Sequence, residues 1–185
     1  YNSVAAWALE QPVQWYDKRR LVPFGEFFPV PQPVREWLRL MNLPYSDFQP
    51  GRADPAPLRA AGETFAPTVC YEDAYGSEQL GLVRQSSLLV NVTNDAWFGD
   101  STAPHQHLDI SRMRSLESGR AMLRATNDGV TALIGHDGAL LGTLPQFQPG
   151  VLTGEVQPRT GLTPYVRFGN WPVLAVLWVG LAVIA

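Results

Sequence analysis

Apolar residues along this chain form short runs, separated by turns rich in glycine and proline. Loose alternation of apolar and polar positions predicts strands over residues 1–9 and 13–16. Two nearly continuous apolar runs, 64–70 and 87–92, predict buried strands, and residues 75–84 between them predict a helix. Because a strand–helix–strand order usually builds parallel strands, this pattern favours an α/β fold whose sheet is covered on both faces.

The other predicted elements are a short helix over 34–41, a long helix over 103–123, a hairpin of strands 130–135 and 139–144, and a last strand over 151–156. The long helix is predicted from helically spaced arginines, with Glu117 one turn from both Arg114 and Arg120. The hairpin is predicted from Asp137-Gly138, a strong turn signal. Residues 24–33 and 42–61 are predicted as loops, and long loops inside a domain are more often functional than idle.

The C-terminal tail carries no charge from Gly169 onward. As a helix, residues 171–185 would extend about 22 Å, whereas a bilayer core needs about 30 Å. The tail is therefore either a buried core helix or the first part of a membrane span. Trp171, Trp178 and a proline at the helix start favour a helix that enters at a membrane interface. We expect the start of a transmembrane helix here.

Composition allows one domain with a sizeable core, because 45% of the 185 residues are hydrophobic and 17% are charged. A net charge of -3 gives no reason to expect a nucleic-acid partner. The chain has no initiating Met and stops inside its apolar tail, so both ends are expected to continue in a longer protein. The expected division is a catalytic domain over 1–162, with its N-terminal part missing, and a linker and helix start over 163–185.

The most informative single residue is Cys70, the only cysteine. It cannot close an internal disulfide, so it either packs as an apolar side chain or reacts. The apolar run before it leads to a turn with two carboxylates, Glu72 and Asp73, and this favours reactivity.

Partners for a cysteine nucleophile are Lys18 and Glu26, because a lysine ammonium stabilises both a thiolate and an oxyanion. The alternatives are a solvated charged turn for Lys18 and, for Glu26, a loop acid that pairs with Arg19 or Arg20. The three histidines, His105, His107 and His136, have no evident place beside a nucleophile. They also lack a third ligand at useful spacing, so no metal and no cofactor is expected.

Three segments resemble the nitrilase superfamily and its Glu-Lys-Cys machinery. These are Tyr-Asp-Lys-Arg-Arg-Leu-Val-Pro-Phe-Gly-Glu over 16–26, Val-Cys-Tyr-Glu-Asp over 69–73 and Asn-Asp-Ala-Trp-Phe-Gly over 94–99. The stretches 112–120, 123–131 and 160–172 resemble, more narrowly, the apolipoprotein N-acyltransferase family. The likeness covers nearly the whole chain. It implies the C-terminal portion of a nitrilase-like α-β-β-α sandwich, followed by the start of a transmembrane helix.

The resemblance also implies roles for individual residues. Cys70 would take an acyl chain from a phospholipid as a thioester, which the N-terminal amine of a diacylglyceryl-cysteine apolipoprotein then attacks. Lys18 would stabilise the oxyanion, together with the backbone N–H of Tyr71, and Glu26 would hold the lysine. Tyr71 and Glu72 would flank the nucleophile, and Trp97 would belong to a loop near the site.

Two departures from the family pattern affect these expectations. The general-base glutamate of the family lies well upstream of the lysine, whereas only Glu10 and Asp17 precede Lys18 here and neither sits in a matching motif. The base is therefore expected on a preceding segment, and this chain alone is expected to be inactive. His105 stands where the family often has an aromatic residue, which puts one loop contact in doubt.

Large apolar side chains are dense around the lysine segment, as a lipid-access gate would require. They are Phe24, Phe27, Phe28, Trp37, Leu40, Met41 and Phe48, with Trp97 and Phe98 as further candidates for acyl-chain contact. More than half of the first group are expected to pack in the core or in the loop itself.

The resemblance further implies a monomer in the bacterial inner membrane, with its catalytic domain on the periplasmic side. Two rival functions stay open. One is a soluble nitrilase-type amidase, in which water resolves the thioester, and the other is a non-catalytic membrane-tethered domain. The apolar tail argues against the first, and the joint presence of Lys18, Glu26 and Cys70 argues against the second.

Overall fold

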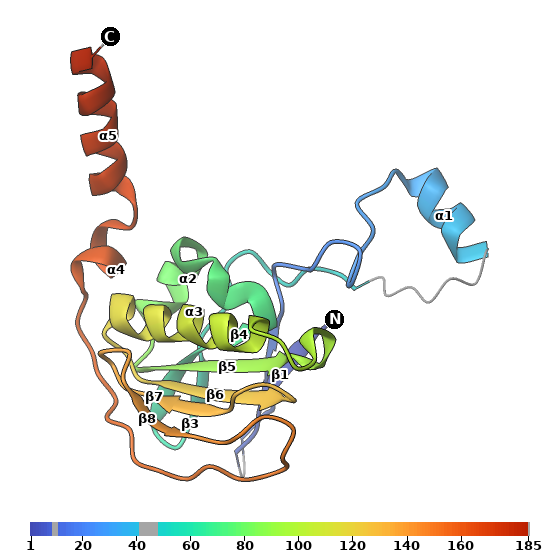
Figure 1. Ribbon diagram of the computed structural model, residues 1–185, viewed down its shortest axis with the longest axis horizontal. Coiled ribbons are helices and arrows are strands. Elements are labelled where there is room, and N and C mark those ends of the chain that lie inside the picture. Colours follow the sequence, from blue (N-terminus) through green and yellow to red (C-terminus); the bar gives the residue numbers. More distant parts are fainter. Residues whose placement is uncertain (9–10, 41–47, 185) are drawn as a thin grey trace.

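The computed structural model describes residues 1–8, 11–40 and 48–184. Its centre is a six-stranded sheet in the order β3-β4-β5-β6-β7-β8 (Figure 1). Strands β4 (Glu63–Val69), β5 (Leu88–Asn94) and β6 (Met122–Asn127) run parallel to one another in the middle of the sheet. The parallel pair β4–β5 confirms the predicted strand–helix–strand unit.

The edges of the sheet are antiparallel. On one side, β3 (Leu58–Ala60) pairs with β4. On the other, β7 (Ala132–Ile134) pairs with β6, and the hairpin partner of β7 is β8 (Leu140–Thr143). This confirms the predicted hairpin. A separate antiparallel pair joins β1 (Ser3–Ala6) to β2 (Gln14–Asp17), so the first predicted strand is present but shorter than 1–9.

Two helices, α2 (Gly76–Val83) and α3 (Ala103–Ser118), lie on one face of the sheet (Figure 1). Within the described residues the predicted helical cover is thus seen on one face. The core lies where these helices meet the parallel strands. Its most deeply buried apolar side chains include Ala66, Leu82, Met122, Ala132, Ile134 and Val166.

Two predictions for the second half of the chain are wrong. The helix predicted over 103–123 ends at Ser118, because Gly119 adopts a left-handed conformation with φ 64° and closes the helix with a backbone hydrogen bond to Leu116. The residues after it form β6, so the helical spacing of the arginines is coincidental beyond Ser118. Residues 151–156 form no strand, and their side chains are mostly exposed.

The predicted loops also differ in detail. The excursion over 42–61 contains the short strand β3 within its described part. The helix predicted over 34–41 is α1 (Gln32–Leu40), which stands away from the body at the end of a long arm (Figure 1). Met41, assigned to that helix and to the apolar group, lies outside the described residues, as does Glu10.

After the sheet, the chain returns to the helical side and ends in two further helices. α4 (Pro164–Phe168) is short and buries Val166, and Thr163 caps it by accepting a hydrogen bond from the Val166 N–H at 3.2 Å. Arg84 and Arg120 hold this region by donating to the carbonyls of Val166 and Gly161 at 3.0 and 2.7 Å.

The last helix, α5 (Trp171–Ile184), projects from the body (Figure 1), and the side chains of residues 171–183 are exposed. Among the described residues, no helix combines the length and the apolar character that crossing a membrane requires.

Candidate active site

Cys70 begins the 3₁₀ turn η1 (Cys70–Ala74), one residue after β4 ends. The sequence predicts Cys70 as the last strand residue, whereas its φ of 53° ends the strand at Val69. This left-handed conformation costs a non-glycine residue about 1 kcal/mol or more, and such residues are common at functional sites. The Cys70 carbonyl accepts a hydrogen bond from Asn91 Nδ2 at 3.2 Å, which fixes the turn against β5.

Lys18 directly follows β2 and is 1% exposed. Its Nζ lies 2.9 and 2.8 Å from the two carboxylate oxygens of Glu26. The alternative of a solvated charged turn therefore does not hold for Lys18. The neighbouring Arg20 is exposed and forms its ion pair with Glu78 instead.

Glu26 accepts two further hydrogen bonds, from Asn2 Nδ2 at 2.7 Å and from the Val22 N–H at 2.8 Å. Burial raises the pKa of this carboxyl, but the hydrogen bonds from Lys18, Val22 and Asn2 together outweigh burial and hold the pKa below its usual value. Glu26 is therefore an ionised partner that fixes the position of the lysine ammonium.

Glu72 connects the lysine segment to the cysteine turn. It is fully buried, and its Oε1 accepts the N–H groups of Arg19 and Arg20 at 2.6 and 3.2 Å. Its Oε2 accepts the Tyr16 hydroxyl at 3.0 Å and the Val69 N–H at 2.8 Å. One carboxylate thus binds the residues next to Lys18 and the residue just before Cys70, and so brings the two segments to one place.

The other two predicted site residues lie at the surface. The exposed Tyr71 ring makes an edge-to-face contact with Tyr75 at a centroid distance of 5.4 Å, and the Arg20 guanidinium lies 5.5 Å from the Tyr75 ring centre. Trp97 is in the short turn η2 (Ala96–Phe98) after β5 and is 84% exposed. Tyr71 and Trp97 are therefore both accessible at the surface, on the turns that follow β4 and β5.

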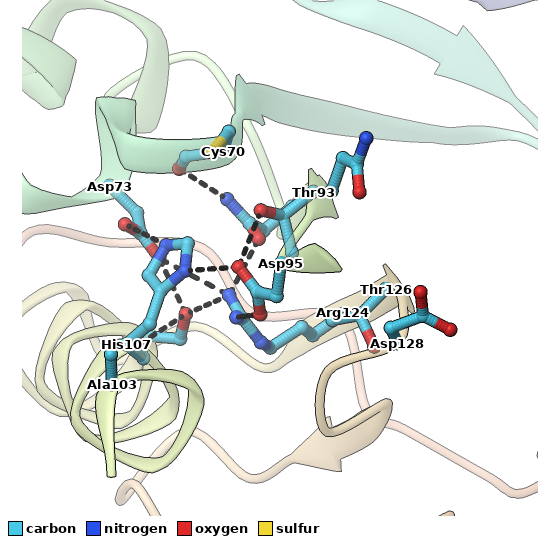
Figure 2. A network of polar contacts seen from close by, with 12 residues as sticks. Cys70, Asp73, Thr93, Asp95, Ala103, His107, Arg124, Thr126 and Asp128 are labelled. Atoms are coloured by element: carbon cyan, nitrogen blue, oxygen red, sulfur yellow. Dashed lines mark hydrogen bonds and ion pairs between the residues drawn. The ribbon is translucent and has the colours of Figure 1, made fainter. Parts of the chain in front are cut away.

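A buried polar network that was not predicted from the sequence lies against the cysteine turn (Figure 2). His107 contacts Asp95 through Nδ1 at 2.9 Å and Asp73 through Nε2 at 3.1 Å. Arg124 donates to Asp95 Oδ2 at 3.1 Å and to Asn91 Oδ1 at 2.7 Å. Through Asn91 the network reaches the carbonyl of Cys70.

The electrostatics of this network follow from its contacts. Burial lowers the pKa of His107, but the hydrogen bonds to Asp73 and Asp95 outweigh burial and raise the pKa to about 9. The imidazole is therefore protonated at neutral pH and donates from both nitrogens. Burial raises the pKa of Asp95, yet His107 and Arg124 hold it below the usual value.

A signal for this network exists in the sequence. Asp73 and Asp95 each follow a predicted strand, and the carboxyl ends of neighbouring parallel strands meet at one edge of a sheet. His107 and Ser111 are four residues apart and share a helix face. The network is nevertheless not evident from the sequence because Arg124, which lies just past the predicted helix 103–123, is grouped by its helical spacing with the arginines of that helix, whereas it lies in β6.

Known proteins resemble this chain in sequence and in fold. The model of the carbon-nitrogen hydrolase family matches residues 1–165. The chain belongs to the carbon-nitrogen hydrolase family. This confirms the nitrilase-like α/β fold that the motifs predict.

Curated relatives of this family member are named apolipoprotein N-acyltransferase. The protein from Azotobacter vinelandii is 50% identical over 171 residues, which cover 91% of this chain and 33% of the relative. The protein from Chromobacterium violaceum is 50% identical over 94% of this chain and 33% of the relative. The chain therefore spans about a third of the length of the curated relatives it matches.

Solved structures share the fold at lower identity. A carbon-nitrogen hydrolase from Helicobacter pylori G27 superposes with a TM-score of 0.56 at 13% identity, over 77% of this chain and 52% of that one. A mutant of the amidase from Nesterenkonia sp. AN1 gives a TM-score of 0.53 at 17% identity, over 89% and 57% of the two chains. At these identities the likeness establishes the fold alone.

Proposed function

We propose that this chain is the catalytic portion of an apolipoprotein N-acyltransferase. It would move a fatty acyl chain from a phospholipid, through a Cys70 thioester, to the N-terminal amine of a diacylglyceryl-cysteine apolipoprotein. The observation that carries the chemistry is the buried Glu72 carboxylate, which ties the Lys18 segment to the Cys70 turn. Within the family, acyl transfer is supported by 50% identity to relatives named apolipoprotein N-acyltransferase.

The reaction has two balanced steps. The Cys70 thiolate attacks the ester carbonyl of the phospholipid, a tetrahedral oxyanion forms, and its collapse releases a lysophospholipid alkoxide that takes up a proton. The apolipoprotein amine then attacks the thioester, loses a proton, and expels the thiolate as the amide forms. In both steps Lys18 Nζ and the Tyr71 N–H would stabilise the oxyanion.

Two buried carboxylates, Glu72 and Asp73, and the half-buried Glu26 have assigned donors. Glu26 is held by Lys18, Glu72 by four donors, and Asp73 by His107 and Ser111. Of the three, Glu26 has a pKa that its donors hold below the usual value, which makes it a poor proton acceptor. The donors to Glu72 and Asp73 fix both carboxylates in place. We assign these three groups to positioning and keep the general base as the separate glutamate that the family resemblance implies.

A lipid donor requires apolar surface beside the site. Phe24, Trp37, Leu40 and Trp97 are each more than half exposed, whereas Phe27, Phe28 and Phe48 are half-buried in the arm itself. We assign the exposed group to contact with lipid. Residues 163–185 would then serve as linker and anchor in the bacterial inner membrane, with the catalytic domain on the periplasmic side.

The rival functions differ in whether a thioester forms, from which donor it forms, and what resolves it. A nitrilase-type amidase would use the same Lys18, Glu26 and Cys70 but would let water resolve a thioester formed from a small amide. A non-catalytic tethered domain would form no thioester. The ion pair of the buried Lys18 with the half-buried Glu26 disfavours the latter, since an idle site gains little by burying a lysine.

Intact mass spectrometry tests the proposal directly. The full-length protein, purified in detergent and incubated with phospholipid, is expected to gain a fatty-acyl adduct that hydroxylamine removes and that maps to Cys70. Adding a diacylglyceryl-cysteine peptide should discharge the adduct onto the peptide amine. A protein that forms no adduct with lipid but releases ammonia from a small amide would belong to the amidase branch.

The matched control is Cys70→Ala. Because the thioester needs the Sγ atom, this variant is expected to show no adduct under conditions that label the parent protein completely. A normal adduct in Cys70→Ala would contradict the assignment of the nucleophile.

A further inference from the structure

The site described so far accounts for Lys18, Glu26, Glu72 and Cys70 but leaves a buried histidine without a role. His107 is 6% exposed and sits between two carboxylates from different segments. Asp73 belongs to the cysteine turn η1, three residues after Cys70. Asp95 directly precedes η2, the turn that carries Trp97. His107 thus joins the two turns that follow the neighbouring strands β4 and β5.

The contacts of His107 use both ring nitrogens, one for each carboxylate (Figure 2). A protonated imidazole has two N–H groups at opposite sides of a rigid ring, so it can bridge two separate acceptors without internal freedom. The second oxygen of Asp73 accepts the Ser111 hydroxyl, and the second oxygen of Asp95 accepts Arg124. Neither aspartate has another histidine or lysine as a partner among the contacts of the described residues.

The charges around His107 are balanced. The charged groups that face it are Asp73 from η1, Asp95 from the end of β5 and Arg124 from β6. Two carboxylates, one imidazolium and one guanidinium sum to zero, which is the condition under which a fully buried charged cluster is tolerated.

We propose that His107 is a positioning residue for the nucleophile: by bridging Asp73 and Asp95, it fixes the Cys70 turn relative to the Trp97 turn. The cysteine turn is then held on two sides by adjacent carboxylates. Glu72 fastens it to the lysine segment, and Asp73 fastens it through His107 to the turn after β5. The effect on the acylation rate rests on the proposed function, whereas the effect on hydrogen exchange in the two turns does not.

The arrangement matters because Cys70 occupies a left-handed conformation that its neighbours must maintain. If the Asp73 side of the turn loosens, Cys70 Sγ moves relative to Lys18 and to the Tyr71 N–H. A displacement of about 1 Å at a reacting atom can cost about a hundredfold in rate. Loss of the bridge should therefore slow acylation more than it lowers the amount of folded protein.

The test compares His107→Gln with His105→Gln in the full-length protein. His105 lies two residues away on the same helix and is exposed, so its variant is the matched control. His107→Gln is expected to lower the single-turnover rate of Cys70 acylation by phospholipid at least about tenfold per folded molecule, with His105→Gln unchanged. Hydrogen exchange should rise in residues 70–74 and 95–98, while the Arg19 and Arg20 amides held by Glu72 keep their protection.

A second variant separates the bridge from the charge balance. His107→Gln combined with Asp73→Asn removes one positive and one negative charge, so the buried cluster stays neutral. This double variant replaces His107→Gln in the test if the single variant does not fold. Slow acylation and raised exchange in both turns of this double variant would support the bridge. An acylation rate equal to that of the parent, or hydrogen exchange raised uniformly across the sheet, would overturn the proposal. His107 would then only stabilise the fold.

Failure of the proposed function is distinguishable from failure of this inference. If the unmodified protein forms no acyl adduct with phospholipid, the proposed acyl-transfer function is rejected. Hydrogen exchange in the two turns then still tests the positioning role of His107. If the adduct forms normally and the exchange of both turns is unchanged in His107→Gln, the inference fails and acyl transfer stands.

Discussion

Glu72 and Asp73 are consecutive residues with fully buried carboxylates, and each binds a different neighbour of the cysteine turn. Burying one carboxylate is costly, and burying two in sequence is tolerated only because each has several donors. Three of the four donors to Glu72 are backbone N–H groups, and the fourth is the Tyr16 hydroxyl. Glu72 thus supplies hydrogen-bond acceptors to backbone N–H groups where the lysine segment meets the cysteine turn.

Glu72→Gln is expected to destabilise the protein by about 2 to 4 kcal/mol. The amide keeps the shape but presents N–H groups to donors that need an acceptor. Thermal unfolding followed by tryptophan fluorescence measures the change, with Glu78→Gln, at a partly exposed glutamate, as control. Equal unfolding temperatures for the two variants would show that the Glu72 contacts contribute little.

Lys18→Ala tests the oxyanion role. Because an electrostatic group at an oxyanion typically contributes a factor of about 10² to 10³ in rate, acylation of Cys70 is expected to fall by that amount while lipid binding persists. Single-turnover mass spectrometry and binding to lipid vesicles measure the two quantities. Arg20→Ala, which removes an exposed neighbouring cation, should leave acylation near the parental rate, and unchanged kinetics in Lys18→Ala would remove the lysine from the site.

The charge of His107 makes the stability of the folded protein depend on pH, in a direction that its pKa defines. Its pKa rises from about 6.5 in the unfolded chain to about 9 in the folded protein, so protonation favours folding. The stabilisation is complete below pH 6.5 and is lost as pH rises through about 9, and its size is about 3 kcal/mol. Unfolding temperatures of the parent and His107→Gln should therefore differ most near pH 6 and converge towards pH 10.

At the scale of elements, the end of α3 decides where the chain re-enters the sheet. Gly119 ends the helix in a left-handed conformation, and Arg120 and β6 follow at once. A Cβ at this position would also lie 3.1 Å from Thr163 Cγ2. The helix end and the approach of the α4 segment thus depend on the same glycine.

Gly119→Ala is expected to destabilise the protein by about 1 to 2 kcal/mol. Gly81→Ala is the matched control, because Gly81 lies within α2 and a Cβ there meets no atom within 4 Å. That change should stabilise the protein by about 0.5 to 1 kcal/mol. Chemical unfolding measures both, and a loss of stability in Gly81→Ala would contradict the argument.

The elements that the sequence predicts well are those with their own local signal. The apolar runs of β4 and β5 and the Asp-Gly turn of the hairpin each specify one structure. The error at β6 arises because Arg124 is buried by partners that are distant in sequence, which no local pattern reports. The same holds for the site. Cys70, Lys18 and Glu26 have motif context, whereas the His107 bridge depends on three elements meeting.

At the scale of the whole molecule, the attachment of α4 has a mechanical consequence. Arg84 and Arg120 bind carbonyls of this region, Val166 is buried, and Gly169 and Asn170 alone separate α4 from α5. Both α5 and the arm that carries α1 leave the body on the side of α2 and α3 (Figure 1). Because only Gly169 and Asn170 join α5 to the anchored α4, the base of α5 is held close to the body. Under the proposed function, in which α5 begins the membrane anchor, this short connection would set the height of the body, and therefore of Cys70, above the bilayer.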